Sequence, residues 1–397
     1  MTTIAGRAEA VGERPQWAVF TAVCAAYLAV SVGESILAPV FPAAAEELGL
    51  DVAHGGIAFG LLAGSIAVGN VAGGYVLARR GPKTAILAAL CVAGIGSLLA
   101  ATAGSALPFF GAQALLGLGA GLFFAPGINV VGTVGGARRG LAMALFGVAF
   151  SAALTVAAVL ASLGARVGWR LPFSVGAVLA TLAAVVVAGS SLPRRRVEPA
   201  GGVRKRLRDA IGLAAVVGSA GALVQYGTVA FFPAFAVDVW HLSPGKAALA
   251  LAVARLVSVP GKMLTGHWAD HLGAIPTARR VGAVLAVSGA WWTLAPGPEW
   301  SVAAAVVFAA GASSVFPIAN LLAFQGFGDR GPLLGTYRSV QMGIGALGSL
   351  AIGGAASIVG LRATLAFSAI VVPAGMMLLG HRARAAARTA RHPLTGA

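Results

Sequence analysis

The sequence predicts an all-α membrane protein with twelve transmembrane helices, arranged as two similar six-helix bundles. Three observations lead to this fold class: the apolar composition, a series of long apolar runs, and a repeat that relates the two halves of the chain. Of its 397 residues, 58% are hydrophobic and only 10% are charged, and the mean hydropathy is +0.88. Soluble domains typically have about a quarter of their residues charged, so this composition indicates a protein that lies in a membrane.

Twelve apolar runs are long enough to cross the apolar layer of a bilayer, which takes about 20 residues in a helix. They lie at residues 17–41, 55–78, 83–104, 107–134, 140–164, 171–191, 210–236, 246–268, 277–295, 300–325, 332–358 and 363–380. Each run is expected to be helical, because a backbone without internal hydrogen bonds is costly in lipid. The first run is too long for the core of a signal peptide, so it is expected to remain as a span.

The distribution of Lys and Arg predicts the topology. Twenty-one of these residues lie in the termini and connections on the side of the N-terminus, and four lie in the connections on the other side. Cytoplasmic segments carry the excess of positive charge. Both termini are therefore expected in the cytoplasm, and the protein is expected in the inner cell membrane as a multi-pass protein.

The same pattern divides the chain into a first bundle (1–191), a basic cytoplasmic linker (192–209), a second bundle (210–380) and a basic cytoplasmic tail (381–397). The net charge of +16 and the basic linker raise the alternative of a nucleic-acid site. However, the basic residues occur in short clusters and not on one face of a domain. A solvated linker near the lipid surface is the favoured interpretation, and no nucleic-acid partner is expected.

Residues of the same type recur at an offset of 191 in the two halves. The pairs are Phe41 and Phe232, Pro42 and Pro233, Pro126 and Pro317, Asn129 and Asn320, Arg139 and Arg330, and Gly140 and Gly331. Such a repeat predicts a duplicated six-helix unit. Because each unit has an even number of spans, both have the same orientation, and the axis that relates them is expected to run along the membrane normal. The interface between the units would then enclose a central cavity.

Two turns of the repeat carry a charged motif bounded by glycine. The first contains Gly74, Arg79, Gly81 and Lys83, and the second contains Gly266, Asp270 and Gly273. This pattern resembles the major facilitator superfamily, whose loop between helices 2 and 3 carries Gly-x-x-x-Asp-Arg-x-Gly-Arg-Lys and whose loop between helices 8 and 9 carries a weaker copy. Ala78 and Pro82 depart from it, since the family has Asp and Arg at these positions.

The resemblance implies a secondary transporter in which two bundles rock around a central site by alternating access. It also implies an inner gate that includes Asp270, Arg79 and Lys83. Because Ala78 replaces the acid of the first copy, a charge latch is expected to depend mainly on Asp270. Gln113 stands where the family often has Arg, and residues 147–163 lack the Gly-Pro motif of many drug/proton antiporters.

Four ionisable residues lie inside the predicted spans: Glu34, Arg255, Lys262 and Arg338. A charge at the centre of a bilayer costs about 2.5–3.5 kcal/mol on insertion scales, so such residues usually face a cavity and have a function there. Glu34 is the only acid among them and is expected to carry the coupling proton. A structural carboxylate is the alternative. The residue that the repeat places opposite Glu34 is Gln225, so only one half carries a titratable group.

Arg255 lies near the middle of its span, and Lys262 follows two helical turns later on the same face. Together they form a positive stripe, and a guanidinium group suits the capture of a carboxylate. Arg255 is expected to anchor the substrate and Lys262 to make a second contact, although Lys262 could instead extend to the lipid surface. Arg338 is expected at the inner gate or interface. Further candidates for the cavity lining are Tyr226, Gln225, Asn129 and Asn320, though buried Asn residues often tie helices together.

These residues predict a transporter, and not an enzyme, that moves a small organic anion together with protons. One embedded acid neutralises at most one of the two deep cations, so the cavity favours an anion. A proton-coupled efflux antiporter for drugs or metabolites is the alternative. His267 and His271 have the spacing of a zinc pair but lack a third ligand nearby, so no metal is expected. No cofactor is expected either, and the predicted partners are the solute, protons and the lipid bilayer, with a monomeric protein.

Overall fold

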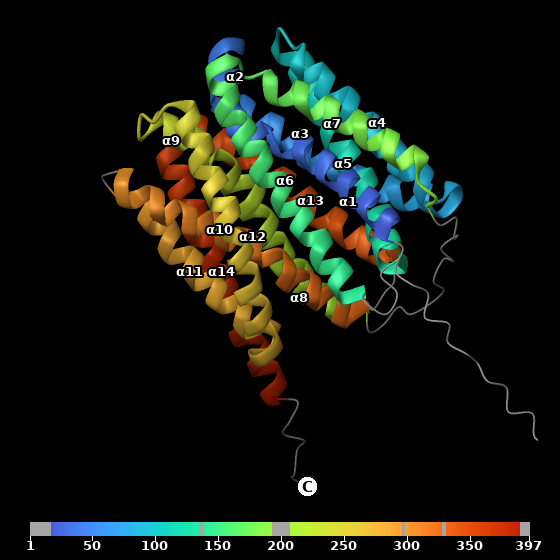
Figure 1. Ribbon diagram of the computed structural model, residues 1–397. Coiled ribbons are helices and arrows are strands. Elements are labelled where there is room, and N and C mark those ends of the chain that lie inside the picture. The colour runs from blue at the N-terminus through green and yellow to red at the C-terminus, as the bar shows by residue number, and fades with distance from the viewer. Residues whose placement is uncertain (1–16, 135–138, 193–206, 296–297, 328–330, 390–397) are drawn as a thin grey trace, which may run out of the picture.

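The computed structural model describes residues 17–134, 139–192, 207–295, 298–327 and 331–389 (Figure 1). Within these ranges every regular element is helical. The helices of the first half are α1 Trp17–Ser35, α2 Leu37–Leu48, α3 Val52–Arg80, α4 Pro82–Ala101, α5 Ala106–Val134, α6 Arg139–Val167 and α7 Leu171–Gly189. The fold class predicted from the apolar runs is therefore confirmed for this half.

The second half repeats this order with one interrupted helix at its start. Its elements are α8 Leu207–Ala222, the π-helical turn η2 Leu223–Thr228, the 3-10 turn η3 Val229–Phe231, α9 Phe232–Asp238, α10 Pro244–Leu272, α11 Ala274–Leu294, α12 Pro298–Phe327, α13 Gly331–Val359 and α14 Leu361–Thr389. Among the described residues, 11 helical segments are long and apolar enough to span a membrane. The remaining predicted span forms α11, whose hydropathy is lower because Arg279 and Arg280 lie in its first turns.

The first span of each half is broken where a continuous helix was expected. Proline lacks the N–H that would bond the carbonyl four residues earlier. For Pro39 that carbonyl belongs to Ser35, where α1 ends, and for Pro233 it belongs to Val229, where η3 begins. The sequence therefore interrupts the two spans at corresponding places in the repeat.

The two motif turns have almost the same backbone. Gly81 separates α3 from α4 with φ 80°, and Gly273 separates α10 from α11 with φ 86°. Side chains with a Cβ rarely adopt such positive φ values. In both turns, therefore, glycine lets one helix end and the next begin without a longer connection.

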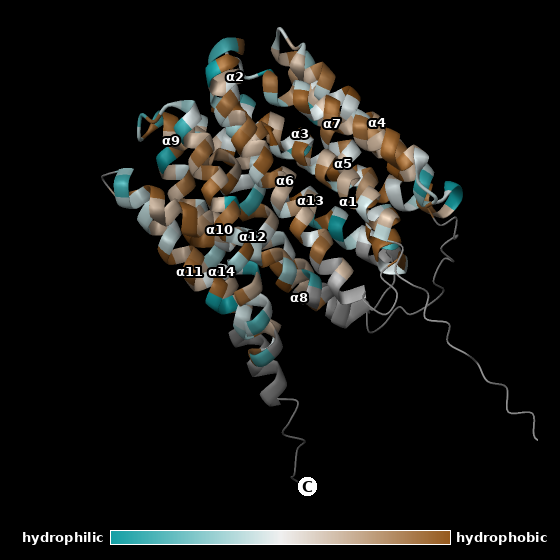
Figure 2. Cartoon of the chain, viewed as in Figure 1, coloured by the Kyte–Doolittle hydropathy of each residue, from teal (hydrophilic) through white to brown (hydrophobic). Residues whose placement is uncertain are grey.

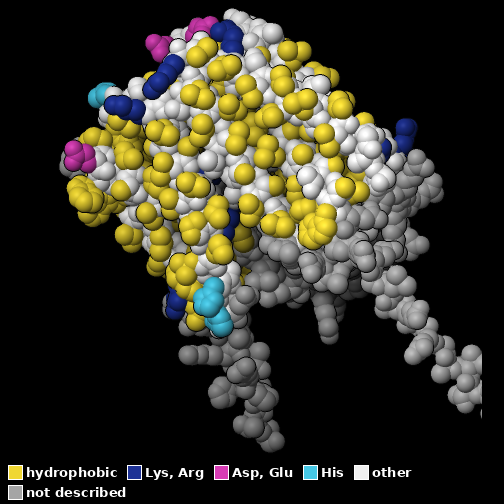
Figure 3. Space-filling view, viewed as in Figure 1, with side chains coloured by type: hydrophobic (Ala, Val, Ile, Leu, Met, Phe, Trp, Pro, Cys, Tyr) yellow, Lys and Arg dark blue, Asp and Glu magenta, His cyan; other side chains and the backbone are white. Residues whose placement is uncertain are grey.

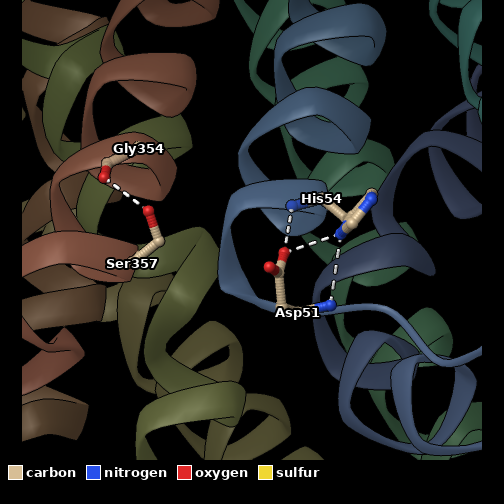
Figure 4. A network of polar contacts seen from close by, with 4 residues as sticks. All are labelled: Asp51, His54, Gly354 and Ser357. Atoms are coloured by element: carbon tan, nitrogen blue, oxygen red, sulfur yellow. Dashed lines mark hydrogen bonds and ion pairs between the residues drawn. The ribbon is translucent and has the colours of Figure 1, made fainter.

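At its N-terminus, α3 begins with a capping box (Figure 4). The backbone N–H of His54 donates to Asp51 Oδ1 at 2.9 Å, and the imidazole Nδ1 lies 2.6 Å from the same oxygen. These contacts satisfy groups that a helix terminus leaves unpaired. The hydrogen bond from the His54 backbone is the main reason that the pKa of Asp51 is below its usual value.

Small residues bring the helices of the first bundle close together. A Cβ added at Gly117 would lie 2.1 Å from the Leu62 carbonyl oxygen, and one added at Gly121 would lie 2.3 Å from that of Ile66. Neither position has room for a side chain. The glycines at these positions therefore serve the close packing of α5 on α3.

The two bundles meet mainly along α3 with α13 and along α6 with α10. Figure 3 shows hydrophobic side chains spread over the middle of the molecule and most of the visible charged ones near its edges. Hydropathy along the helices follows the same division, with hydrophilic residues concentrated near helix ends (Figure 2). This outer surface is suited to contact with lipid, so the polar groups inside the molecule require a different explanation.

Candidate functional site

A cavity of about 730 Å³ lies between the two bundles. Its wall combines residues of α1, α3, α5 and α6 with residues of η2, α10, α12 and α13. The polar and charged side chains in this wall are those of Tyr27, Glu34, Ser35, Ser151, Gln225, Tyr226, Arg255, Lys262, Ser313, Asn320 and Arg338. The structure therefore brings together most of the residues that the sequence singled out, from both halves of the repeat.

Aromatic side chains close the cavity at the end where α3 begins. The ring of Phe59 packs on Phe231 from the other bundle at 5.0 Å between centroids, and on Phe41 at 5.8 Å. Beside them α3 crosses α13 so closely that a Cβ on Gly56 would lie 2.8 Å from the Cα of Gly353. At this end, therefore, the two bundles are in direct contact.

Arg255 is held deep in the wall by neutral groups of its own bundle. Its side chain is only 5% exposed. Nη1 donates to Gln225 Oε1 at 3.2 Å and to Ser313 Oγ at 3.0 Å. Both bonds come from Nη1, and the other guanidinium nitrogens make no hydrogen bond with the described residues, while Arg255 lines the cavity. Among the described residues, no carboxylate forms an ion pair with Arg255.

Lys262 reaches across the interface between the bundles. Its Nζ donates to Ser151 Oγ on α6 at 2.9 Å and lies 5.8 Å from the centroid of the Phe150 ring. The same side chain lies in the cavity wall, two turns from Arg255 on α10. Among the residues that the structure describes, Lys262 forms no ion pair with a carboxylate, so no described counter-charge competes with a bound anion.

Glu34 lies at the end of α1, one residue before the break, and faces the cavity. Arg338 lies in the wall as well, with its guanidinium 4.8 Å from the centroid of Phe316 and Nη1 donating to Gln341 Oε1 at 3.2 Å. Among the described residues it forms no ion pair with Glu34, although both side chains line the cavity. Arg338, expected at a gate or interface, therefore shares the cavity with the acid.

An aromatic wall follows the same side of the cavity. The ring of Tyr27 stacks on Phe146 at 4.1 Å and on Phe150 at 5.5 Å between centroids. Sequence reasoning did not select Tyr27, although it lies seven residues before Glu34 and so shares its helix face. Ser151 and Ser313 were also missed, because a single serine in an apolar span has no pattern that marks it.

The two asparagine candidates differ in position. Asn320 lines the cavity, whereas Asn129 lies beside the lining residue Ile128 on α5 and is half-buried.

Among the described residues no group of three metal-ligating side chains occurs. The rings of His267 and His271 do lie close together, 4.3 Å between centroids.

The motif residues of the first turn contact their own bundle. Lys83 Nζ donates to the carbonyl oxygens of Ala188 at 2.7 Å and Ser190 at 2.9 Å, which ties α4 to the end of α7. The Arg79 guanidinium lies 4.2 Å from the centroid of the Tyr75 ring, near the exposed end of α3. In the second turn, Gly266 lies on α10 and Gly273 ends it, while the side chain of Asp270 lies outside the described part of the chain. A latch through Asp270 therefore remains a prediction.

Comparison with known proteins agrees with this architecture. A family model described as the Major Facilitator Superfamily matches residues 23–349. The nucleoside transporter NupG superposes with a TM-score of 0.74 at 11% identity, covering 91% of this chain and 99% of that one. A structure of tetrameric PepTSo2 has a TM-score of 0.73 at 16% identity (94% and 99% covered), and a D-xylose–proton symporter has 0.71 at 15% (91% and 97%).

These likenesses concern the fold, since the identities are low. No curated protein matches the chain. The family model, by contrast, covers most of the sequence and includes both bundles and the cavity between them. The chain therefore belongs to the Major Facilitator Superfamily and has the fold of its membrane transporters.

Proposed function

We propose that the chain is a secondary transporter that moves a small organic anion by alternating access, coupled to protons through Glu34. The observation that carries this proposal is the charge balance of the cavity. Three cations, Arg255, Lys262 and Arg338, share the wall with one acid, Glu34. The described wall is therefore positive when Glu34 is ionised and more positive when it is protonated, which favours an anionic ligand in both states.

The arrangement of these groups suggests how the anion is held. Arg255 is fixed by Gln225 and Ser313 and offers its remaining N–H groups to the cavity. Planar guanidinium groups bind carboxylates with two parallel hydrogen bonds. A second contact from Lys262 requires only that it leave the hydroxyl of Ser151. We infer that the acidic group of the substrate lies between these two cations.

The rest of the wall suits an apolar body. Tyr27, Phe146 and Phe150 stack along one side, and Phe316 faces the cavity near Arg338. Binding sites with many aromatic side chains and few polar ones favour ligands that have a large apolar surface. The proposed substrate is therefore an organic anion with an apolar or aromatic body, and not a small inorganic ion.

Glu34 and Arg338 support the proton step. Both side chains line the same cavity, so an ionised Glu34 offsets part of the positive charge that Arg338 adds to it, and a protonated Glu34 does not. Protonation therefore changes the charge that the anion meets in the cavity. This gives proton binding and anion binding a direct electrostatic connection.

A proton-coupled efflux antiporter for drugs or metabolites remains the second candidate. The large apolar wall favours it, because amphiphilic drugs bind to such surfaces. The three cations of the cavity oppose the binding of a cationic drug. The two functions therefore differ in the charge of the ligand that binds.

Thermal-shift and calorimetric titrations of the purified protein with carboxylates, amino acids and cationic drugs would distinguish the anion transporter from the drug antiporter. We expect stabilisation by aromatic carboxylates, and we expect Arg255→Ala to weaken their binding by roughly 10- to 150-fold, the effect of losing a charged hydrogen bond. Lys246→Ala is the matched control, since it removes an exposed cation from the same helix. Full affinity of Arg255→Ala for a carboxylate, or stabilisation by cationic drugs alone, would contradict the proposal.

A further inference from the structure

Glu34 also faces a second, much smaller hollow. Its volume is about 20 Å³, and it lies among α1, α3, α5, α6, η2 and α13. Glu34, Tyr27 and Arg338 line both hollows, while Ser31 and Asn70 line only the small one. The carboxyl group therefore lies between the large cavity and a pocket that extends into the first bundle.

Asn70 is an unusual group to find in this pocket. Its side chain is 1% exposed, and neither the amide nitrogen nor the amide oxygen has a hydrogen-bond partner among the described residues. Ser31, one turn before Glu34 on α1, is also 1% exposed and lines the same pocket. Buried polar groups are nearly always hydrogen-bonded, and an unpaired amide indicates a partner such as ordered water.

The pocket meets the requirements of a bound water molecule. A water needs about 10–15 Å³ of accessible space and two to four polar partners. Asn70, Ser31 and Glu34 provide these partners from α3 and α1. A metal cation is disfavoured because Arg338 lines the same pocket and would repel it.

We propose that Asn70 and Ser31 hold water against Glu34, and that this water is the first carrier of the coupling proton as it passes between Glu34 and the solvent. When the carboxyl group releases its proton, the water oxygen accepts it and passes one of its own protons on, so the water is not consumed. Asn70 is thus a positioning residue that does not titrate. The proposal rests on the role of Glu34 proposed above.

The position of the small pocket matters when the anion is bound. An apolar body bound on Tyr27 and Phe150 would cover the cavity side of Glu34. The small pocket approaches the carboxyl group from the side of Ser31. The titratable and charged groups that face Glu34 there are Arg338 of α13 and the phenols Tyr27 and Tyr226, while the described lining residues of α5 and α6 are uncharged. The proposed water would therefore stay beside Glu34 while the anion is bound.

Infrared difference spectroscopy after a pH jump tests the proposal on the full-length protein in liposomes. The carboxyl band of Glu34 is assigned by its loss in Glu34→Gln, and its rate of change reports proton transfer. We expect Asn70→Leu to slow this rate by roughly two- to tenfold, the effect of a lost neutral hydrogen bond on a barrier. Ser31→Ala, from a different helix, is expected to slow it as well, and Asn70→Ser is expected to retain most of the rate.

Gln113→Leu is the matched control. Gln113 is also a fully buried amide without a partner among the described residues, but it lines neither hollow, so the rate is expected to stay unchanged. A normal rate in both Asn70→Leu and Ser31→Ala would overturn the water route and leave Glu34 as the proton site. A band that responds to added sodium at constant pH would replace water by a cation. Absence of any Glu34 band would overturn the proton role itself.

Discussion

The two broken spans of the cavity wall occupy corresponding places in the repeat, yet they differ in structure and chemistry. In the first half, α1 ends at Ser35 and α2 begins at Leu37, directly after Glu34. In the second half, the break extends over η2 and η3 and begins just before Gln225. Discontinuous helices at corresponding places of internal repeats are typical of transporter binding sites.

The difference shows how a duplicated unit divides two tasks. Glu34 presents a titratable group to the cavity, whereas Gln225 uses its amide oxygen to hold Arg255. The π turn also frees the carbonyl of Tyr226, which accepts a hydrogen bond from Ser349 Oγ at 2.8 Å. One half thus supplies the proposed proton carrier and the other a fixed cation, so neither half alone forms the site.

Removing the titratable group of the first half has the largest expected effect. Glu34→Gln gives both breaks an amide. We expect accumulation driven by a pH gradient to fall by at least about 100-fold, in line with the contribution of proton-transfer groups. Anion binding to the purified variant is expected to remain measurable, because Arg255 is unchanged. Uptake in proteoliposomes measures the first result and calorimetry the second.

The control for this variant is Glu299→Gln, which removes an exposed acid at the start of α12. It is expected to accumulate substrate normally. If Glu34→Gln accumulates an aromatic carboxylate as well as the unchanged protein does, the first break has no role in coupling.

The converse change places an acid in the second half. Gln225→Glu would replace the neutral partner of Arg255, 3.2 Å from Nη1, by a carboxylate that competes with the substrate. We expect the affinity for an aromatic carboxylate to fall by roughly 10- to 100-fold, since a charge pair in the cavity wall would have to be broken for binding. Calorimetry at several pH values measures the loss, which should shrink as the introduced carboxylate becomes protonated at low pH.

Combining both changes sharpens the comparison further. In a protein with Glu34→Gln and Gln225→Glu, the acid has moved to the other break. We expect no recovery of driven accumulation, because the new carboxylate would pair with Arg255 and lie away from the small pocket. Recovery would show that the half that carries the acid does not matter.

Much of the architecture was accessible from the sequence, for physical reasons. Twelve apolar runs and the offset of 191 predicted the spans and the duplication, because lipid requires long apolar helices and a repeat fixes their order. Glu34 and Arg255 stood out because an isolated charge in a span is costly. The structure places both in the central cavity.

Other features depend on packing that no short pattern records. The π turn at Leu223–Thr228 contains no proline, and its single glycine, Gly227, does not distinguish it from an ordinary span of this glycine-rich chain. The depth of Arg338 could be counted along the chain, but the direction of its side chain depends on how α13 packs against the first bundle. Lys83 donates to backbone carbonyls at the end of α7. Every residue has a backbone carbonyl, so no residue type in the sequence marks these two as acceptors.

The support of the π turn provides the smallest of these tests. Ser349→Ala would remove the hydrogen bond to the Tyr226 carbonyl and leave the turn held mainly by its own bonds. A neutral hydrogen bond contributes about 0.5–1.5 kcal/mol, so we expect anion affinity to fall by roughly two- to tenfold. Backbone amides of residues 223–231 are expected to exchange hydrogen faster. Ser357→Ala is the matched control, because this exposed serine of α13 bonds only to Gly354 of its own helix at 2.8 Å (Figure 4). Equal exchange rates in the two variants would mean that the turn does not depend on α13, and that Gln225 positions Arg255 by the packing of its own span alone.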